Sequence, residues 1–317
     1  MLISFKYSIN NYIVKNLEQK SQSAGNIISG TFETLREGIV NIENIKLISK
    51  HVPKHIKPLN DEQLGYYLAG LIDGDGHFSK TPQLVLVFSS PDAFLAYFIK
   101  SQLGFGTVKK VKSKKILLLI IAKSKGIEKV FNLINGKIRT QSKYDNINKY
   151  IFNDPCLNLR MDFKLNNSNC LDNHWLAGFS DALAIFQIIG LNYQRKLSFR
   201  LKNPNKNLLT LIKSFLGGNI SYNYPSGSYT YDSSSFGSAR KVIKYFDKYH
   251  LLSKKHIDYL KWRKVYLDIF KNQAACRRNY STESNKVLPA DLKLNLDPTP
   301  FLKGGGLGWI HPLWVGS

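Results

Sequence analysis

The chain contains an internal repeat, and this repeat limits the folds open to it more than any other feature. Residues 68–76 read LAGLIDGDG and residues 176–184 read LAGFSDALA, at an offset of 108. Within the first hairpin the offset grows to 113, which pairs Leu84 with Leu197 and places five extra residues in the first hairpin of the second copy. The sequence therefore predicts a pseudo-dimer of two similar units joined in one chain.

Each copy has the pattern of a helix, a hairpin, a helix, a hairpin and a helix. In the first copy Asn60 can cap the motif helix while Gln63 reaches back to it, and Gly74 and Gly76 permit the helix to end. Apolar runs and alternations then mark the strands. The sequence predicts an α+β fold with two αββαββα domains related by a pseudo-two-fold axis. The predicted elements that follow are 77–80, 84–88, 91–103, 107–113, 116–122 and 126–134, then 197–202, 205–216, 219–224, 228–233, 237–249 and 253–270.

These elements divide the chain into five parts. We expect an N-terminal extension at residues 1–57, a first domain at 58–152, a linker at 153–173, a second domain at 174–271 and a tail at 272–317. The tail has no helical or strand period and carries Trp309 and Trp314. Two interpretations of the tail stay open: an extended arm whose tryptophans need a protein or RNA partner, and a frayed end.

The chain is strongly basic, with a formal net charge of +23 and a pI near 9.8. A field of this sign attracts polyanions such as nucleic acid or an anionic membrane surface. Codon bias is an alternative source of the lysines, because Lys, Asn, Ile and Tyr are abundant together, but it does not explain the shortage of acids. We therefore expect a nucleic-acid partner.

Composition also excludes several classes of protein. The three cysteines, Cys156, Cys170 and Cys276, are widely spaced and form no CxxC pair, which indicates neither a disulfide framework nor a zinc site. The longest apolar run, residues 116–122, is far shorter than the roughly 20 residues that cross a bilayer. We expect no membrane insertion and a reducing compartment.

The two motif segments carry small residues and acids at fixed places. Small residues let two helices pack with their backbones in contact. Asp73 and Asp75 stand at the C-terminal end of the first motif helix, where the helix dipole disfavours anions by about 0.3–1 kcal/mol, which suggests a compensating cation. Two acids at converging helix ends would supply oxygen ligands for Mg²⁺ beside a phosphodiester. The small residues predicted to line the seam between the helices are Ala69, Gly70, Ala177 and Gly178.

Both segments resemble the signature of the LAGLIDADG homing-endonuclease and intron-maturase family, in its double-motif form with a degenerate second motif. The resemblance covers about residues 51–270, and residues 51–58 are similar to mitochondrial intron-encoded members. It implies that the motif helices form the domain interface, and that saddle-shaped four-stranded antiparallel sheets straddle a DNA major groove. It also implies a mitochondrial location and a metal-binding acid at the eighth motif position of each copy.

Carried onto this chain, the resemblance assigns the catalytic acid and metal ligand to Asp75 and the degenerate position to Leu183. Leucine cannot coordinate Mg²⁺, so this cofactor is expected only if cleavage is retained. Asp181, which the second motif keeps, is expected to be a helix-end residue. In this family a lysine near the last hairpin helps to stabilise the phosphate, which points to Lys143 and Lys254 as further catalytic residues; an ordinary surface lysine is the alternative.

Two surfaces are predicted to bind nucleic acid. On one strand of the second copy, alternation turns Ser198, Arg200 and Lys202 outward, as suits a nucleic-acid groove, although a solvated sheet face is the alternative. The equivalent strand of the first copy, residues 84–88, offers no polar face. The tyrosines of the second copy's last hairpin leave base stacking and cross-strand pairing both open. The second surface is a lysine cluster typical of phosphate binding: Lys109, Lys110, Lys112, Lys114 and Lys115.

Two functions follow from these features. An active Mg²⁺-dependent DNA homing endonuclease is favoured by Asp75 and opposed by Leu183. An RNA-binding derivative, either a group I intron maturase or an architectural component of a mitochondrial ribonucleoprotein such as the mitoribosome, needs a basic surface but no second acid. The sequence favours RNA binding by a monomeric pseudo-dimer, with cleavage lost or reduced to nicking. An eroding reading frame stays open as a third interpretation.

Overall fold

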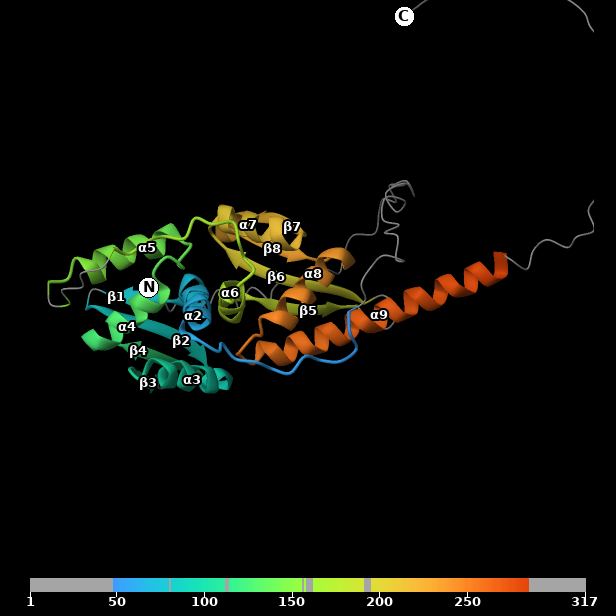
Figure 1. Ribbon diagram of the computed structural model, residues 1–317. Coiled ribbons are helices and arrows are strands. Elements are labelled where there is room, and N and C mark those ends of the chain that lie inside the picture. The colour runs from blue at the N-terminus through green and yellow to red at the C-terminus, as the bar shows by residue number, and fades with distance from the viewer. Residues whose placement is uncertain are drawn as a thin grey trace, which may run out of the picture. The chain divides into compact units, whose positions relative to one another are not determined.

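The computed structural model describes residues 48–79, 81–111, 114–155, 157, 162–190 and 195–284, with side chains described up to Lys271 (Figure 1). The first half holds α2 (Asp61–Asp75), β1 (His77–Ser79), β2 (Gln83–Ser89), η3 (Ser90–Asp92), α3 (Ala93–Leu103), β3 (Thr107–Lys110), β4 (Ile116–Ile121), α4 (Ser124–Ile134), α5 (Gln141–Ile147) and η4 (Asn148–Phe152). The second half holds α6 (Trp175–Leu183), β5 (Ile185–Ile189), β6 (Lys196–Asn203), α7 (Lys206–Leu216), β7 (Asn219–Asn223), η6 (Tyr224–Ser226), β8 (Ser228–Ser233), α8 (Phe236–Lys248) and α9 (Lys255–Ser284).

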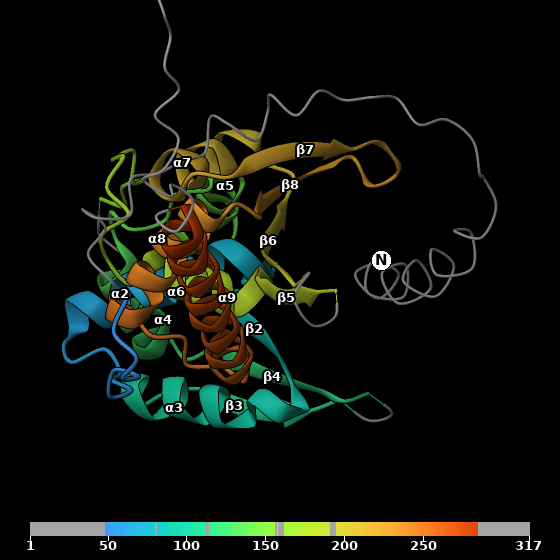
Figure 2. The same cartoon turned by 90° about the vertical axis from the view of Figure 1, so that its right-hand side faces the viewer.

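The two halves share one sheet topology. The strand orders are β1-β2-β4-β3 and β5-β6-β8-β7, and every neighbouring pair is antiparallel. In each sheet, alternate side chains of the long central strand are buried under the helices; in β2 these are Leu84, Leu86 and Phe88. The predicted α+β fold with two repeated domains is therefore confirmed. Figure 2 shows the β3–β4 and β7–β8 hairpins projecting to the same side of the helices.

Helices α2 and α6 pack against each other between the two sheets, with their backbones in contact (Figure 1). A Cβ built on Gly70 would lie 1.9 Å from the carbonyl oxygen of Trp175, and one built on Gly178 would lie 1.9 Å from that of Tyr67. Trp175 and Tyr67 hold equivalent positions in the two copies, so the contact is symmetric. Ala69 and Ala177 are fully buried beside these glycines. Because no side chain fits at either contact, only glycine permits this approach.

The end of the N-terminal extension, residues 48–57, contacts both halves. The Nη2 group of buried Arg263 donates to the carbonyl of Ser49 at 2.8 Å, and the His55 Nε2 lies 2.8 Å from a backbone carbonyl between α8 and α9. Further along, the Lys57 ammonium lies 4.5 Å from the ring centre of Phe94 on α3. Residues 48–57 therefore connect the second half to the first, although the sequence suggested no role for them. Residues 1–47 lie outside the described residues.

The last helix of the second domain is longer than predicted. Helix α9 continues to Ser284, so an extended arm does not begin at Asn272. Residues 272–284 include Ala274 and Ala275 and contain no Gly or Pro, which favours helix even without an apolar period. Trp309 and Trp314 lie outside the described residues. In the first half, α5 and η4 also extend the helical structure through residues where no helix was predicted, since their sequence is mostly polar.

We predict that Gly70→Ala and Gly178→Ala each lower the free energy of unfolding by about 1–3 kcal/mol or more, because the added methyl group meets backbone rather than a movable side chain. Chemical denaturation would measure the change. Gly237→Ala in α8 is the matched control, since a Cβ there meets nothing within 4 Å and alanine is the better helix former. Equal stability of all three variants would contradict the close contact.

Candidate active site and nucleic-acid interface

The C-terminal ends of α2 and α6 converge, and they bring the two eighth motif positions to one place. Asp75 is the last residue of α2 and Leu183 the last of α6, and both are half-buried. A Cβ built on Gly74 would lie 3.5 Å from Leu183 Cγ, which shows how closely the ends approach. A carboxylate and an isobutyl group therefore stand where the repeat would otherwise place two acids.

The sixth-position acid of the first motif is fixed by N–H donors from both halves. Asp73 is 2% exposed and accepts hydrogen bonds from the backbone N–H of Arg139 at 2.8 Å and of Thr140 at 3.1 Å. The indole Nε1 of Trp175, on the other motif helix, donates at 2.8 Å. Burial raises the pKa of Asp73, and these hydrogen bonds act in the opposite direction. The carboxylate is satisfied mainly by N–H groups, not by the cation that the helix dipole suggested.

Asp181 repeats this arrangement in the second half. The backbone N–H groups of Leu252 and Ser253 donate to it at 2.7 and 3.2 Å, and the Tyr67 hydroxyl of the other motif helix donates at 2.6 Å. Each carboxylate thus ties its own domain to the partner helix. Asp181 is more than a helix-end residue, and its role could not be seen from the sequence because its backbone partners lie about 70 residues away. Only the retained aspartate in both motifs hinted at it.

Lys143 reaches the end of the first motif. Its ammonium group donates to the carbonyl oxygen of Gly76, the residue that follows Asp75. Burial lowers the pKa of Lys143, and the nearby carboxylates of Asp73 and Asp75 act in the opposite direction. The first half therefore holds one acid and one amine close together beside the converged helix ends.

Lys254 is not the structural counterpart of Lys143. The backbone N–H groups of Thr140 and Ser253 make the same bond to their sixth-position acids, which keeps the offset at 113 and aligns Lys143 with His256. Lys254 is exposed instead. The predicted equivalence is wrong because it matched a Ser-Lys dipeptide rather than the hydrogen-bond register. Burial, with a smaller effect of two neighbouring histidines, lowers the pKa of His256 to about 4, so this ring is neutral at physiological pH.

The outward face of the second sheet is polar. Arg200 is paired with Asp232 on β8, with Nε 3.2 Å from the carboxylate, and Lys202 is exposed two residues further along β6. Ser198 lies on the same face, but its side chain donates to Asp232 and the residue is only 2% exposed. The expectation that Ser198 is accessible is therefore wrong. Its side chain is buried, and its hydroxyl holds Asp232 in place through a hydrogen bond.

The outward face of the first sheet is apolar at its centre. Val85 and Val87 of β2 pair with Ile120 and Leu118 of β4, and all four side chains are half-buried. Among the described residues, the polar and basic groups of this face stand at its margins and on its hairpin. Among the predicted lysines, Lys109, Lys110 and Lys115 are exposed, Lys114 is half-buried, and Lys112 lies outside the described residues.

The tyrosines of the β7–β8 hairpin divide between the two interpretations. Tyr222 and Tyr229 face each other across the strands, with ring centres 4.8 Å apart, and Tyr231 is fully buried. These three rings form cross-strand and core contacts. Tyr224 at the turn is 86% exposed and Tyr222 is 44% exposed, so these two retain ring surface open to a base.

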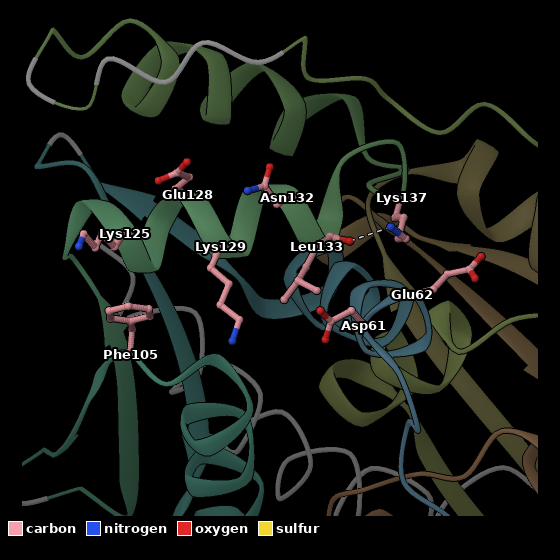
Figure 3. Close-up of a pocket in the computed structure, with 9 residues that line it drawn as sticks. All are labelled: Asp61, Glu62, Phe105, Lys125, Glu128, Lys129, Asn132, Leu133 and Lys137. Carbon is pink, nitrogen blue, oxygen red and sulfur yellow. Dashed lines mark hydrogen bonds between the residues drawn. The ribbon is translucent and has the colours of Figure 1, made fainter.

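A pocket of about 630 Å³ lies elsewhere (Figure 3). It is bounded by the first turn of α2, by α4 and by Phe105, at the end of α2 opposite to Asp75. Figure 3 shows three acids and three lysines around it: Asp61, Glu62, Glu128, Lys125, Lys129 and Lys137. This mixture of charge includes none of the predicted site residues.

Comparison with known proteins identifies the family. The sequence profile of the LAGLIDADG endonuclease family matches residues 176–266. Over 283 residues the chain is 54% identical to the "Uncharacterized cox1 intron-2 37.2 kDa protein" of Schizosaccharomyces pombe, which covers 85% of this chain and 86% of that protein. The chain belongs to the LAGLIDADG family. It is also 28% identical to the "Intron-encoded DNA endonuclease aI3" of Saccharomyces cerevisiae, over 74% of this chain and 70% of that one.

Solved LAGLIDADG structures share the fold. The meganuclease I-AabMI bound to uncleaved DNA superposes with a TM-score of 0.53 at 20% identity, covering 66% of this chain and 92% of that one. I-SmaMI, bound to uncleaved DNA in the presence of calcium ions, gives a TM-score of 0.51 at 22% identity, with the same two coverages. At these identities the likeness concerns the fold alone. No helix among the described residues is long and apolar enough to cross a membrane.

The LAGLIDADG eighth positions do not fit a pair of metal ions held by two acids. Asp75 offers one carboxylate, whereas the Leu183 side chain has no ligand atom. Within the described part of the chain, no three or more His, Cys, Asp or Glu side chains gather as a metal would require. The first half therefore offers a phosphodiester one carboxylate, that of Asp75, beside Lys143.

We predict that Tyr67→Phe and Trp175→Phe each reduce the free energy of unfolding by about 1.5–3 kcal/mol, because each removes a hydrogen bond to a buried carboxylate. Thermal or chemical unfolding would measure both. Tyr66→Phe, one residue earlier on α2, keeps the ring that lies near Lys137 and should change stability little. If Tyr67→Phe behaved like that control, the proposed tie between the halves would be wrong.

Proposed function

We propose that this chain is a nucleic-acid-binding LAGLIDADG protein, derived from a homing endonuclease, in which double-strand cleavage is lost or reduced to nicking and RNA is the favoured ligand. The observation that carries the proposal is Leu183 at the converged helix ends, opposite Asp75. An acid there would help to activate water at the second strand, and leucine cannot. His256, neutral at physiological pH, aligns with Lys143 of the first half.

The basic surface supports a nucleic-acid ligand. Lys109, Lys110 and Lys115 are exposed on the β3–β4 hairpin, and Lys202 is exposed on the second sheet. Charges of this kind bind phosphates and position a duplex or a folded RNA without fixing its sequence. The formal net charge of +23 favours binding of RNA phosphates, and this binding does not require a second acid at the eighth motif position.

The relatives support both a DNA and an RNA function. The chain is 27% identical to the "Intron-encoded RNA maturase bI4" of Saccharomyces cerevisiae, over 72% of this chain and 38% of that one. We propose the same role for this chain, or an architectural role in a mitochondrial ribonucleoprotein. The relative named for a cox1 intron supports a mitochondrial origin.

The alternative function is a Mg²⁺-dependent site-specific DNA endonuclease. The observation in its favour is that Asp75 and Lys143 remain close together at the end of the first motif helix. Such a half-site would act on one strand only, so nicking is the chemistry that this alternative supports best.

We predict that the unmodified chain with Mg²⁺ gives at most nicked circles from a supercoiled plasmid. The plasmid carries the junction of the two exons that flank the intron encoding this chain, without that intron. Leu183→Asp should raise the linear product at least about tenfold, because it restores an oxygen ligand at the second strand. Leu183→Ala is the matched control, since it removes the leucine without adding a carboxylate, and it should leave the product unchanged. Efficient double-strand cleavage by the unmodified chain would overturn the loss of cleavage.

We also predict that binding to the folded transcript of the host intron survives salt better than binding to duplex DNA. Purely electrostatic contacts weaken steeply as counterions are released, whereas contacts to a specific RNA shape do not. Filter binding over a salt series would compare this transcript with junction DNA and with a scrambled RNA of equal length. Equal salt slopes for all three ligands would refute the RNA preference.

A further inference from the structure

Arg200 and Asp232 form an ion pair on the outward face of the second sheet. They face each other directly across β6 and β8, and their side chains are 40% and 27% exposed. A pocket of about 430 Å³ opens over them, bounded also by Ser221, Thr230 and the tyrosines at the β7–β8 turn. A ligand that lies along this sheet can therefore reach both side chains.

Asp232 is itself held in place. The buried Ser198 hydroxyl donates to Asp232 Oδ1 at 2.8 Å, which leaves Oδ2 for the Nε of Arg200 at 3.2 Å. Within the described part of the chain, the two Nη groups of Arg200 have no hydrogen-bond partner. A guanidinium held through Nε presents its Nη groups as two neighbouring donors in a fixed plane. The pair thus orients a two-donor fork before any ligand binds.

A phosphate is a poor ligand for this fork. Asp232 cancels the positive charge of Arg200 and would repel phosphate oxygens only a few ångströms away. Lys202, on the same face of β6, is exposed and is not paired with an acid among the described residues. The group that matches two parallel donors without carrying a charge is the O6 and N7 edge of guanine.

We infer that Arg200, positioned by Asp232, binds the O6/N7 edge of a guanine, so that the second half requires a guanine at one fixed place in its ligand. The inference rests on the proposed nucleic-acid binding and names a residue of its specificity. In the first half the equivalent pair across the strands is Val87 and Leu118, which offers no such fork. Base reading through this device is thus confined to the second half.

The test selects bound sequences from a randomised pool of duplex DNA and a randomised pool of RNA, using the full chain. We expect one strongly enriched guanine in the pool that carries the natural ligand type. In the selected ligand, replacing that guanine by 7-deazaguanine, which lacks N7, should weaken binding about tenfold. Inosine, which keeps O6 and N7, should bind as guanine does.

Three variants separate the roles of the side chains. Arg200→Ala should abolish the 7-deazaguanine penalty. Asp232→Asn should lower the preference for guanine while raising affinity for unrelated sequences, because a negative charge is removed. Lys202→Ala, the matched control two residues along β6, should weaken all sequences alike and leave the penalty unchanged.

The outcomes distinguish the inference from the proposed function. Binding of nucleic acid with no enriched guanine, or a 7-deazaguanine penalty that persists in Arg200→Ala, overturns the inference and leaves the proposed function standing. Failure of the full chain to bind either pool overturns both. Enrichment in the DNA pool alone supports the guanine site and overturns the preference for RNA.

Discussion

The backbone contact between α2 and α6 is the constraint on which the rest of the structure depends. Gly70 and Gly178 let each helix approach a carbonyl of the other so closely that no side chain fits between them. This approach sets the distance between the two domains, brings the helix ends together and places Tyr67 and Trp175 within reach of the opposite carboxylates. A wider helix pair would separate all of these groups at once.

The same contact explains how the fold tolerates a leucine at one of the two eighth motif positions. The groups that hold the helices together are the glycines and the sixth-position acids Asp73 and Asp181, and both copies retain them. The eighth position does not contribute to this framework, and Leu183 packs there against the core as an ordinary apolar side chain. The residues that hold the helices together are therefore distinct from the eighth-position residues, so Leu183 can occupy that position without disturbing the framework.

The two halves are specialised in opposite ways. The first half keeps an acid beside a lysine at the helix ends, but the centre of its outward sheet face is apolar. In the second half Leu183 takes the place of the acid and His256 aligns with Lys143, yet its sheet carries Arg200, Lys202 and a supported carboxylate. A ligand that spans both halves would meet a carboxylate beside a lysine on one side and a polar sheet face on the other.

The sequence by itself determined the repeat, the α+β class, the cap at Asn60, the converging acid and leucine, and the polar alternation along β6, because each depends on local spacing or on comparison of the two copies. Tertiary structure alone decided the partners of Asp73 and Asp181, the burial of Ser198 and the alignment of Lys143 with His256. These depend on which distant backbone N–H groups meet a buried carboxylate, and no local pattern encodes such a pairing. The contacts of residues 48–57 with both halves were also decided by tertiary structure, since Arg263 lies more than 200 residues from the carbonyl to which it donates.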